Sequence, residues 1–366
     1  MKKKLALLLS AVMAFSAFAG CAKQTPPPAD PAPSQATEPS TEATEPSAQA
    51  TEPPSEPDKV IYEVNFAALS GPTGVGAAQM LDAYGTPEGG QDHAPAAMEV
   101  NYFIAASNDE ITPALINGTL DIAAVATNLA ANLSAKTEGG VQVLCLNTLG
   151  VLYILEKGDT VHEMADLAGK TLYAPSNTKG ANPEHILNHL LKKSGVDPSE
   201  VDIQWLTPQE ITAKMTTEDA GICMLPVPAA TAVLVKDAGV REAISLSQAW
   251  EDAEGSPLPM GCIVARTEFI EENPEAVAKF LEIYEDSVTY IADEANREDA
   301  AEKVAQLGIT PNAAIAKRAI PQCNLTFTTG QEMKDVLERY YAVLFQNAPG
   351  SIGGEMPYDS FYYGVE

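Results

Sequence analysis

The feature that most constrains the fold is a strand, a loop of small residues and a helix, which occur in this order twice. The first apolar run, 64–69, ends in Ser-Gly-Pro-Thr-Gly at 70–74, and a helical pattern covers 75–84. The second run, 171–174, ends in Pro-Ser-Asn-Thr-Lys-Gly-Ala at 175–181, and a helix is expected over 183–194, with Asn182 as its N-cap. Strands that alternate with helices predict parallel sheets, which bind ligands beyond the carboxyl ends of their strands.

Each junction is followed by two further strand patterns, at 99–105 and 121–126 in the first half and at 202–206 and 220–225 in the second. The chain therefore predicts two α/β lobes, each a mainly parallel sheet flanked by helices. Crossovers between them are expected near 148–153 and 257–263, where they would act as a hinge. Two later stripes of apolar residues at helical spacing, over 277–291 and over 333–345, are expected to pack in the core; the second ends at Phe345.

The loops at the strand ends are the expected ligand site, in a cleft between the lobes. Glycines allow close approach of a ligand, and hydroxyls, amides and helix N-termini supply hydrogen bonds. A phosphate-binding P-loop is excluded, since Ala77 and Ala78 stand where Lys and Ser or Thr are needed. The predicted ligand-binding residues are Ser70, Gly71, Thr73, Gly74, Thr127, Asn128, Ser176, Asn177, Thr178 and Pro226.

The start of the chain predicts export. Three lysines precede the apolar run 5–18, which ends in Phe-Ala-Gly before Cys21 and is too short for an ordinary membrane-spanning helix. Small residues before a cysteine resemble the bacterial lipoprotein box, so Cys21 is the expected site of lipidation. The expected parts are a signal peptide (1–20), a disordered tether rich in Pro, Thr and Glu (21–58), lobe 1 (59–150 and 257–366) and lobe 2 (151–256).

Composition excludes several function classes. The net charge of −28 with only 22 Lys and Arg argues against a nucleic-acid surface. His185 and His189 are expected on the solvated face of their helix, with no third ligand spaced for zinc, so no metal or cofactor is expected. No catalytic residue is expected, because the predicted loops hold no His, Cys, Asp or Glu. Glu110 and Glu184 are carboxylates in the first turns of nearby helices, where they suit the helix dipole.

Four further cysteines lie in apolar stretches without Cys-x-x-Cys spacing, which favours buried free thiols. They are Cys145, Cys223, Cys262 and Cys323. Cys145 and Cys262 lie beside the expected crossovers, where a disulfide is the open alternative in an exported chain.

The sequence as a whole resembles the ABC-transporter substrate-binding lipoproteins of the nitrate, sulfonate and taurine-binding type, which include binders of thiamine precursors. The resemblance rests on the lipoprotein signal, the loop at 70–76, Asp-Ile-Ala-Ala-Val-Ala-Thr-Asn at 121–128, Leu-Pro-Val-Pro at 225–228, the segment 264–277 and the tail 352–362. In relatives the Leu-Pro-x-Pro loop commonly carries Glu where this chain has Val227, so the same ligand contact is not implied there.

This resemblance implies a type 2 periplasmic-binding-protein fold and no enzymatic activity. It implies an extracytoplasmic, lipid-anchored monomer that binds a small organic molecule and delivers it to an ABC permease with its ATPase. Two alternatives remain: an enzyme of the same fold acting on a small carbonyl compound, similar to menaquinone-pathway enzymes, or a surface protein that senses a ligand. The ligand could be a sulfonate, a nitrate-like anion, or a pyrimidine or other heteroaromatic molecule.

Overall fold

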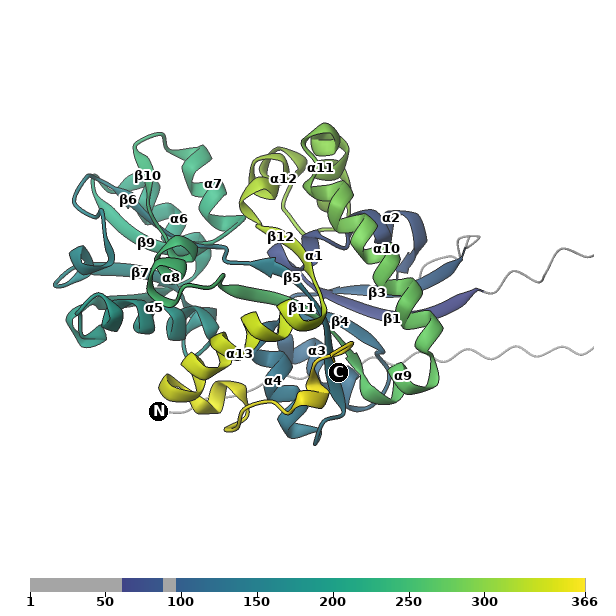
Figure 1. Ribbon diagram of the computed structural model, residues 1–366. Coiled ribbons are helices and arrows are strands. Elements are labelled where there is room, and N and C mark those ends of the chain that lie inside the picture. The colour runs from purple at the N-terminus through teal and green to yellow at the C-terminus, as the bar shows by residue number, and fades with distance from the viewer. Residues whose placement is uncertain (1–60, 88–96, 366) are drawn as a thin grey trace, which may run out of the picture. The chain divides into compact units, whose positions relative to one another are not determined.

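The strands form two mixed sheets, one in each lobe (Figure 1). The computed structural model describes residues 61–87 and 97–365, all within one compact unit, Pro57–Glu366. In lobe 1 the strand order is β12-β5-β11-β4-β1-β3-β2, and in lobe 2 it is β10-β6-β9-β7-β8. The strands are β1 (Tyr62–Leu69), β2 (Gly85–Pro87), β3 (Met98–Ala105), β4 (Ile122–Ala126), β5 (Val141–Leu149), β6 (Leu152–Lys157), β7 (Thr171–Pro175), β8 (Asp202–Leu206), β9 (Gly221–Pro226), β10 (Val240–Ser245), β11 (Pro259–Arg266) and β12 (Leu325–Thr328).

The strands expected to be parallel form one half of each sheet. In lobe 1, β1 lies parallel to β3 and β4, and in lobe 2, β7 lies parallel to β8 and β9. Antiparallel strands complete both sheets: β11 pairs with β4 and β5, and β6 pairs with β9 and β10. The ends of β1, β4, β7 and β9 that carry the predicted loops are therefore carboxyl ends, as the α/β pattern requires.

The chain passes between the sheets twice. β5 ends at Leu149 and β6 begins at Leu152, so the first crossover is the dipeptide Gly150-Val151. The second runs from the end of α8 at Glu254 to Pro259, where β11 begins. The two predicted crossovers are thus confirmed, and both are short. The first joins β5 of lobe 1 to β6 of lobe 2, and the second joins α8 of lobe 2 to β11 of lobe 1.

Helices cover both faces of the lobe 1 sheet (Figure 1). Side chains of β1, β4 and β11 alternate between the two faces, as a pleated strand requires. One face packs against α2 and α10, and the other packs against α3, α4 and α13. The helices outside lobe 2 are α1 (Pro72–Val75), α2 (Ala78–Tyr84), α3 (Asn108–Ile116), α4 (Thr127–Lys136), α9 (Thr267–Glu272), α10 (Pro274–Ala292), α11 (Arg297–Gln306), α12 (Ala313–Ala319) and α13 (Gly330–Asn347).

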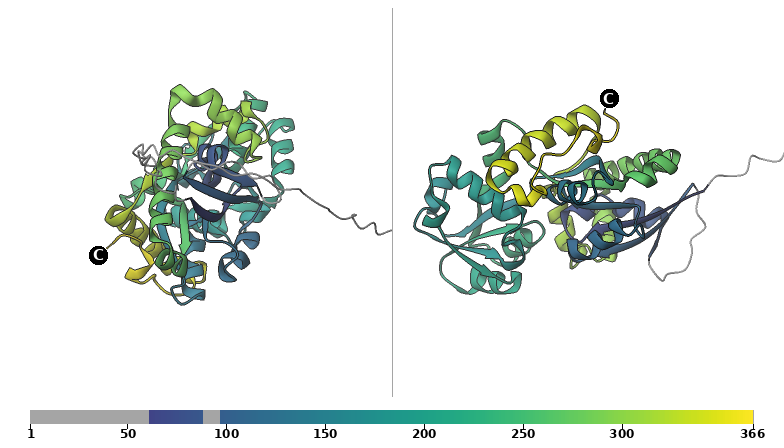
Figure 2. Two further views of the ribbon diagram at one scale, coloured as in Figure 1. Left: turned by 90° about the vertical axis from the view of Figure 1, so that its right-hand side faces the viewer. Right: turned by 90° about the horizontal axis from the view of Figure 1, so that it is seen from below.

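The lobe 2 sheet is covered by α5 and α8 on one face and by α6 and α7 on the other. These helices are α5 (Asn182–Lys193), α6 (Pro208–Thr217), α7 (Ala229–Lys236) and α8 (Leu246–Glu254). One hydrophobic cluster runs through both lobes, since it contains Ile154 and Trp250 of lobe 2 together with Val264 and Tyr340 of lobe 1. Figures 1 and 2 show α13, in yellow, reaching from the lobe 1 sheet towards lobe 2.

Two helices differ from the predictions. The helix expected over 75–84 is divided into α1 and α2, because the carbonyl of Gly76 accepts a hydrogen bond from the Ser287 hydroxyl (2.7 Å), which in turn accepts one from the Met80 N–H (2.9 Å). The apolar stripe of α13 is buried as expected, but Phe345 at its end is 43% exposed.

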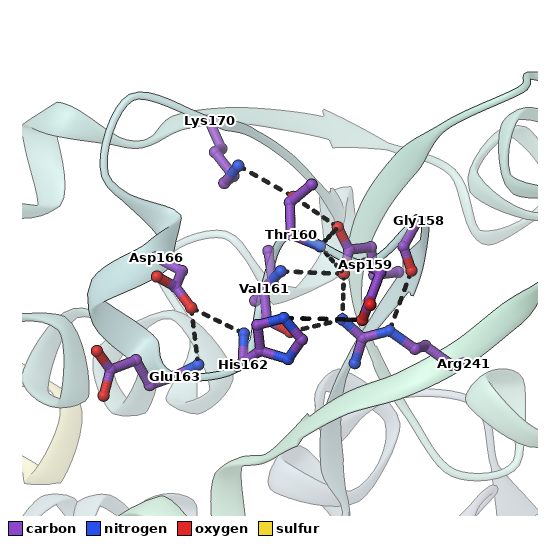
Figure 3. Close-up of polar contacts among 10 residues, drawn as sticks. Gly158, Asp159, Thr160, Val161, His162, Glu163, Asp166, Lys170 and Arg241 are labelled. Atoms are coloured by element: carbon purple, nitrogen blue, oxygen red, sulfur yellow. Dashed lines mark hydrogen bonds and ion pairs between the residues drawn. The ribbon is translucent and has the colours of Figure 1, made fainter.

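The loop that follows β6 is fixed by a buried carboxylate. Glu156, only 2% exposed, accepts hydrogen bonds from the Thr160 N–H (2.9 Å), the Thr160 hydroxyl (2.7 Å) and the Val161 N–H (3.1 Å), and it pairs with Arg241 Nη2 (2.6 Å). Figure 3 shows Arg241 also donating to the carbonyls of Gly158 and Val161. Burial alone would raise the pKa of Glu156, but the hydrogen bonds from Thr160 and Val161 and the charge of Arg241 lower it.

None of the helices that the structure describes is both long enough and apolar enough to span a bilayer. The predicted signal peptide, Cys21 and the tether up to residue 58 lie outside the described residues.

Candidate functional site

The first predicted loop leaves β1 in a conformation that depends on its glycines. Ser70 donates its N–H to the Ala105 carbonyl (2.8 Å), and Gly71 has a φ of 110°, which favours glycine. A Cβ on Gly74 would lie 2.4 Å from the Leu69 carbonyl oxygen. Ser70 remains exposed, and a Cβ on Gly71 would meet no atom within 4 Å. The loop thus offers an accessible hydroxyl and an open space beside a glycine.

A buried asparagine of β5 stabilises this loop. Asn147 donates Nδ2–H to the Thr73 carbonyl (2.9 Å) and to the Tyr284 hydroxyl oxygen (2.8 Å). A Cβ on Gly261 of β11 would lie 2.6 Å from Asn147 Oδ1 and 3.0 Å from the Thr73 side chain. Burial raises the pKa of Tyr284, which stays a neutral hydroxyl. The loop is therefore seated on both strands that lead to the crossovers.

The second predicted segment, Thr127-Asn128, begins α4 and contacts the second crossover. The Thr127 hydroxyl donates to the Pro259 carbonyl (2.9 Å), and the Thr127 carbonyl accepts from the Tyr341 hydroxyl (2.9 Å). Asn128 Nδ2 donates to the Ser351 carbonyl (3.4 Å). Thr127 is fully buried, so its hydroxyl serves the junction between β4, β11 and α13.

The third predicted segment is the lobe 2 loop at the end of β7. Ser176 and Asn177 are exposed, whereas Thr178 is buried and donates its hydroxyl to the Pro175 carbonyl (2.6 Å). The backbone N–H of Gly180 donates to the Glu184 carboxylate. Glu184 thus stabilises this loop, and Glu110 of α3 does the same in lobe 1 by accepting the Ala106 N–H (3.4 Å).

Asn182 corrects one prediction. It is the first residue of α5, whose N-cap is Ala181, and its side chain makes no cap hydrogen bond. Instead its Oδ1 accepts from the Tyr340 hydroxyl of α13, and its Nδ2 lies 3.7 Å from Met260 Sδ of β11. Burial raises the pKa of Tyr340, so this phenol is a neutral donor. The Asn182 side chain does not cap the helix because it forms tertiary contacts with lobe 1 instead.

The fourth predicted segment contains Pro226, at the end of β9. The next residue, Val227, is fully buried in the core of lobe 2, and its N–H donates to the Val151 carbonyl of the first crossover (3.0 Å). The Val227 side chain therefore packs in the core and does not face the predicted cleft as a ligand contact would. Three of the four predicted segments, those with Thr73, Thr127 and Val227, contact a crossover or a strand that enters one.

A cavity of about 330 Å³ touches both crossovers. It is lined by Leu149, Gly150, Ser247, Glu251, Pro257, Leu258, Asn324, Leu325 and Thr326. None of these belongs to the four predicted segments, so this cavity lies on the side of the crossovers that α8 and β12 cover.

His189 corrects a second prediction. It is buried between α5, α8 and α13, with Nε2 2.7 Å from Glu254 Oε1 and its ring 5.3 Å from that of Trp250. Lys193 Nζ lies 2.9 Å from the same oxygen. Burial would raise the pKa of Glu254, but hydrogen bonds from Lys193 and His189 lower it. The prediction that His189 lies on a solvated face was wrong, because α8 and α13 cover this residue. The sequence of α5 alone does not reveal that cover.

The cysteines in the described part of the chain are all buried free thiols, as predicted. Burial raises the pKa of Cys223 and of Cys323 to about 12, and it raises the pKa of Cys145 and Cys262 as well. Within residues 61–87 and 97–365 no three His, Cys, Asp or Glu side chains are grouped so that they could hold a metal ion.

Comparison with known proteins decides the family. Residues 94–297 match the family described as "NMT1/THI5 like", and this match covers more than half of the 366 residues. The chain belongs to the NMT1/THI5-like family. Comparison with curated protein sequences gives no match.

Solved structures similar to this NMT1/THI5-like protein have the same fold. An ABC transporter protein from Parabacteroides distasonis is 20% identical with a TM-score of 0.67, and the match covers 83% of this chain and 99% of that one. The periplasmic aliphatic sulphonate-binding protein SsuA from Escherichia coli is 15% identical with a TM-score of 0.63, covering 80% and 96%. The alkanesulfonate-binding SsuA from Xanthomonas axonopodis pv. citri is 13% identical with a TM-score of 0.55, covering 78% and 93%. The NMT1/THI5-like protein thus has the two-lobed periplasmic-binding-protein fold.

Proposed function

We propose that the protein is an extracytoplasmic solute-binding lipoprotein that captures a small organic molecule between its lobes and delivers it to an ABC importer. The observation that supports the proposal is that predicted loops of both lobes contact the crossovers: β5 and β11 support the loop at Thr73, and the Val227 N–H donates to the Val151 carbonyl. Ser70 and Gly71 come from lobe 1, and Ser176 and Asn177 come from lobe 2. A ligand held by both pairs would link the lobes and favour a closed form.

The boundaries of the proposed lobes follow from the same crossovers. Lobe 1 is residues 59–150 and 257–366, and lobe 2 is residues 151–256. Both boundaries fall in the crossovers, so a rotation there would change the distance between the loops without unfolding either sheet. The structural neighbours described as sulfonate-binding or periplasmic support the transport role and the location outside the cytoplasm.

The accessible groups of the proposed site suit binding without chemistry. Ser70, Ser176 and Asn177 supply hydroxyls and an amide, and Lys179 is the one cation of the predicted loops. The nearby carboxylates of Glu110 and Glu184 accept backbone N–H groups of their own loops. The described loops therefore offer hydrogen bonds to a small polar molecule but no nucleophile paired with a general base.

A screen for compounds that stabilise the purified protein against heat tests the function. A bound compound should be recovered unchanged in a one-to-one ratio, and small-angle scattering should show compaction on binding. Catalytic conversion of the compound would overturn the binding role, and a bound ligand without compaction would overturn closure between the lobes.

Site variants locate the binding. Ser70→Ala and Ser176→Ala should each weaken binding about two- to tenfold, the effect of losing one neutral hydrogen bond. Ser194→Ala, also exposed but at the opposite end of α5, is the matched control and should bind like the parent. Equal affinities for all three variants would show that the ligand lies elsewhere.

Anchoring through a lipid on Cys21 completes the proposal. Its support is the sequence alone: the apolar run before Cys21 and the tether of 38 residues from 21 to 58 that would hold the globular part away from a membrane.

A further inference from the structure

The cavity of about 330 Å³ at the crossovers lies on the side away from the four predicted segments. In the lobe 1 sheet, β4 and β1 lie on one side of the crossover strands β5 and β11, and β12 lies on the other. In the lobe 2 sheet, β9 and β7 lie on one side of β6, and β10, which leads directly into α8, lies on the other. The predicted segments follow β1, β4, β7 and β9, so the crossovers separate them from the cavity.

The walls of this cavity belong to different lobes. Asn324, Leu325 and Thr326, at the start of β12, form the lobe 1 wall, and Ser247 and Glu251 of α8 form the lobe 2 wall. Residues of both crossovers complete the lining. Any rotation at the crossovers therefore changes the distance between the two walls.

The lobe 1 wall is fixed to the first crossover. Asn324 donates its Nδ2–H to the Gly150 carbonyl (2.5 Å), and its own carbonyl accepts the Leu149 N–H (3.0 Å). Its φ of 44° lies in the left-handed region, which asparagine enters more readily than most residues. Beyond Gly150 the chain enters lobe 2, so a rotation after this residue moves α8 relative to the lobe 1 wall.

The lobe 2 wall packs against the same glycine. A Cβ on Gly150 would lie 2.0 Å from Ser247 Oγ, so this contact requires a glycine. Ser247 Oγ is shielded from solvent and has no hydrogen-bond partner within the described part of the chain. A buried hydroxyl without a partner is costly, and most such groups in proteins are satisfied. The cost falls on the arrangement with the walls close together, and it disappears when the walls separate and water reaches the hydroxyl.

We propose that the crossovers act as a fulcrum, so that this cavity widens when the cleft between the predicted loops closes. The inference rests on the closure in the proposed function and adds a second place that controls it. A bulky side chain that holds the walls apart favours the closed cleft. Removal of the Ser247 hydroxyl favours the open cleft, because the cost of the close contact is lost. A larger closed population raises the apparent affinity for the solute without any change in the loops.

Distances between pairs of spin labels test the proposal on the solute-free protein that carries Cys21→Ala. One pair, Ser107→Cys and Asn177→Cys, spans the cleft from loops of the two lobes, and the other, Thr329→Cys and Gln248→Cys, spans the cavity side. All four positions are exposed, whereas the native cysteines of the described chain are buried and should not be labelled. Opposite changes in the two distances are the signature of a fulcrum.

Glu251→Trp and Thr326→Trp add bulk to opposite walls of the cavity, so each should shorten the distance across the cleft and lengthen the distance on the cavity side. Ser247→Ala should have the reverse effect. Asp252→Trp is the matched control, since Asp252 is exposed on the same helix, carries the same charge as Glu251 and does not line the cavity. It should leave both distances as in the parent, and thermal unfolding should show that every variant is folded.

Unchanged distances in both tryptophan variants of the cavity would overturn the proposal. Changes of the two distances in the same direction would also overturn it, because the lobes would then move without a fulcrum at the crossovers. So would equal effects of Glu251→Trp and Asp252→Trp. These measurements use no solute, so a failure here leaves the proposed solute binding untouched.

Discussion

Replacement of Glu156 by Gln should destabilise lobe 2 by about 3 kcal/mol. Removing one partner of a buried ion pair costs about 3–5 kcal/mol. Arg241 is 32% exposed and keeps Asp159 Oδ1 at 3.2 Å, so we expect the lower end of this range. The glutamine amide would also turn donor hydrogens towards the N–H groups of Thr160 or Val161, which now donate to the carboxylate.

Urea unfolding at neutral pH measures the loss, and Glu200→Gln is the control because Glu200 is exposed in the same lobe. The pKa of Glu156 is lowered in the folded protein, so its contribution is complete above the unfolded pKa of about 4.3 and is lost as the pH falls through the folded pKa. The gap between parent and variant should therefore narrow in acid. A loss of less than about 1 kcal/mol, or a gap that widens in acid, would refute the reasoning.

Three further predictions follow from other parts of the chain. Cys21→Ala should release the protein from washed membranes, and continued retention would contradict lipidation. Tyr340→Phe removes the hydroxyl that donates a hydrogen bond to Asn182 Oδ1, and it should lower the free energy of unfolding by about 1–3 kcal/mol in denaturant titrations. An unchanged value would show that this contact between the lobes does not contribute to stability. Cys223 and Cys323 should resist a thiol reagent at neutral pH until the protein unfolds, and rapid labelling of the native state would contradict their burial.

Local patterns predicted most elements of the fold. The strand expected over 202–206 is β8 as observed, and a capping box of Thr207 and Glu210 begins α6. The errors lie where a distant part of the chain competes for a side chain. The side-chain amide of Asn182 contacts α13 and β11, and α8 and α13 cover His189. Neither partner is visible in the sequence around these residues.

Three of the four predicted loops contact a crossover or a strand that enters one, but the residues that hold the first loop in place were not predicted. Asn147 is followed by Thr148 near the end of a mostly apolar strand, a pattern that gives no signal of its own. Gly261 lies in another such strand, and only the three-dimensional contact with Asn147 and Thr73 shows why a side chain is excluded there. Tyr284 belongs to a helical stripe that was correctly expected in the core, although its hydroxyl also binds Asn147.

The position of β11 has a consequence for the order in which the molecule can assemble. β11 lies between β4 and β5, although it follows them in sequence by more than 100 residues. During synthesis from the N-terminus, the edges of β4 and β5 that pair with β11 therefore lack their partner until residue 266 has been made. The other partner of β5, β12, is made later still. The residues of lobe 2, in contrast, form one continuous stretch with local strand pairs. Lobe 2 can fold first, and the sheet that carries the first predicted loop closes last.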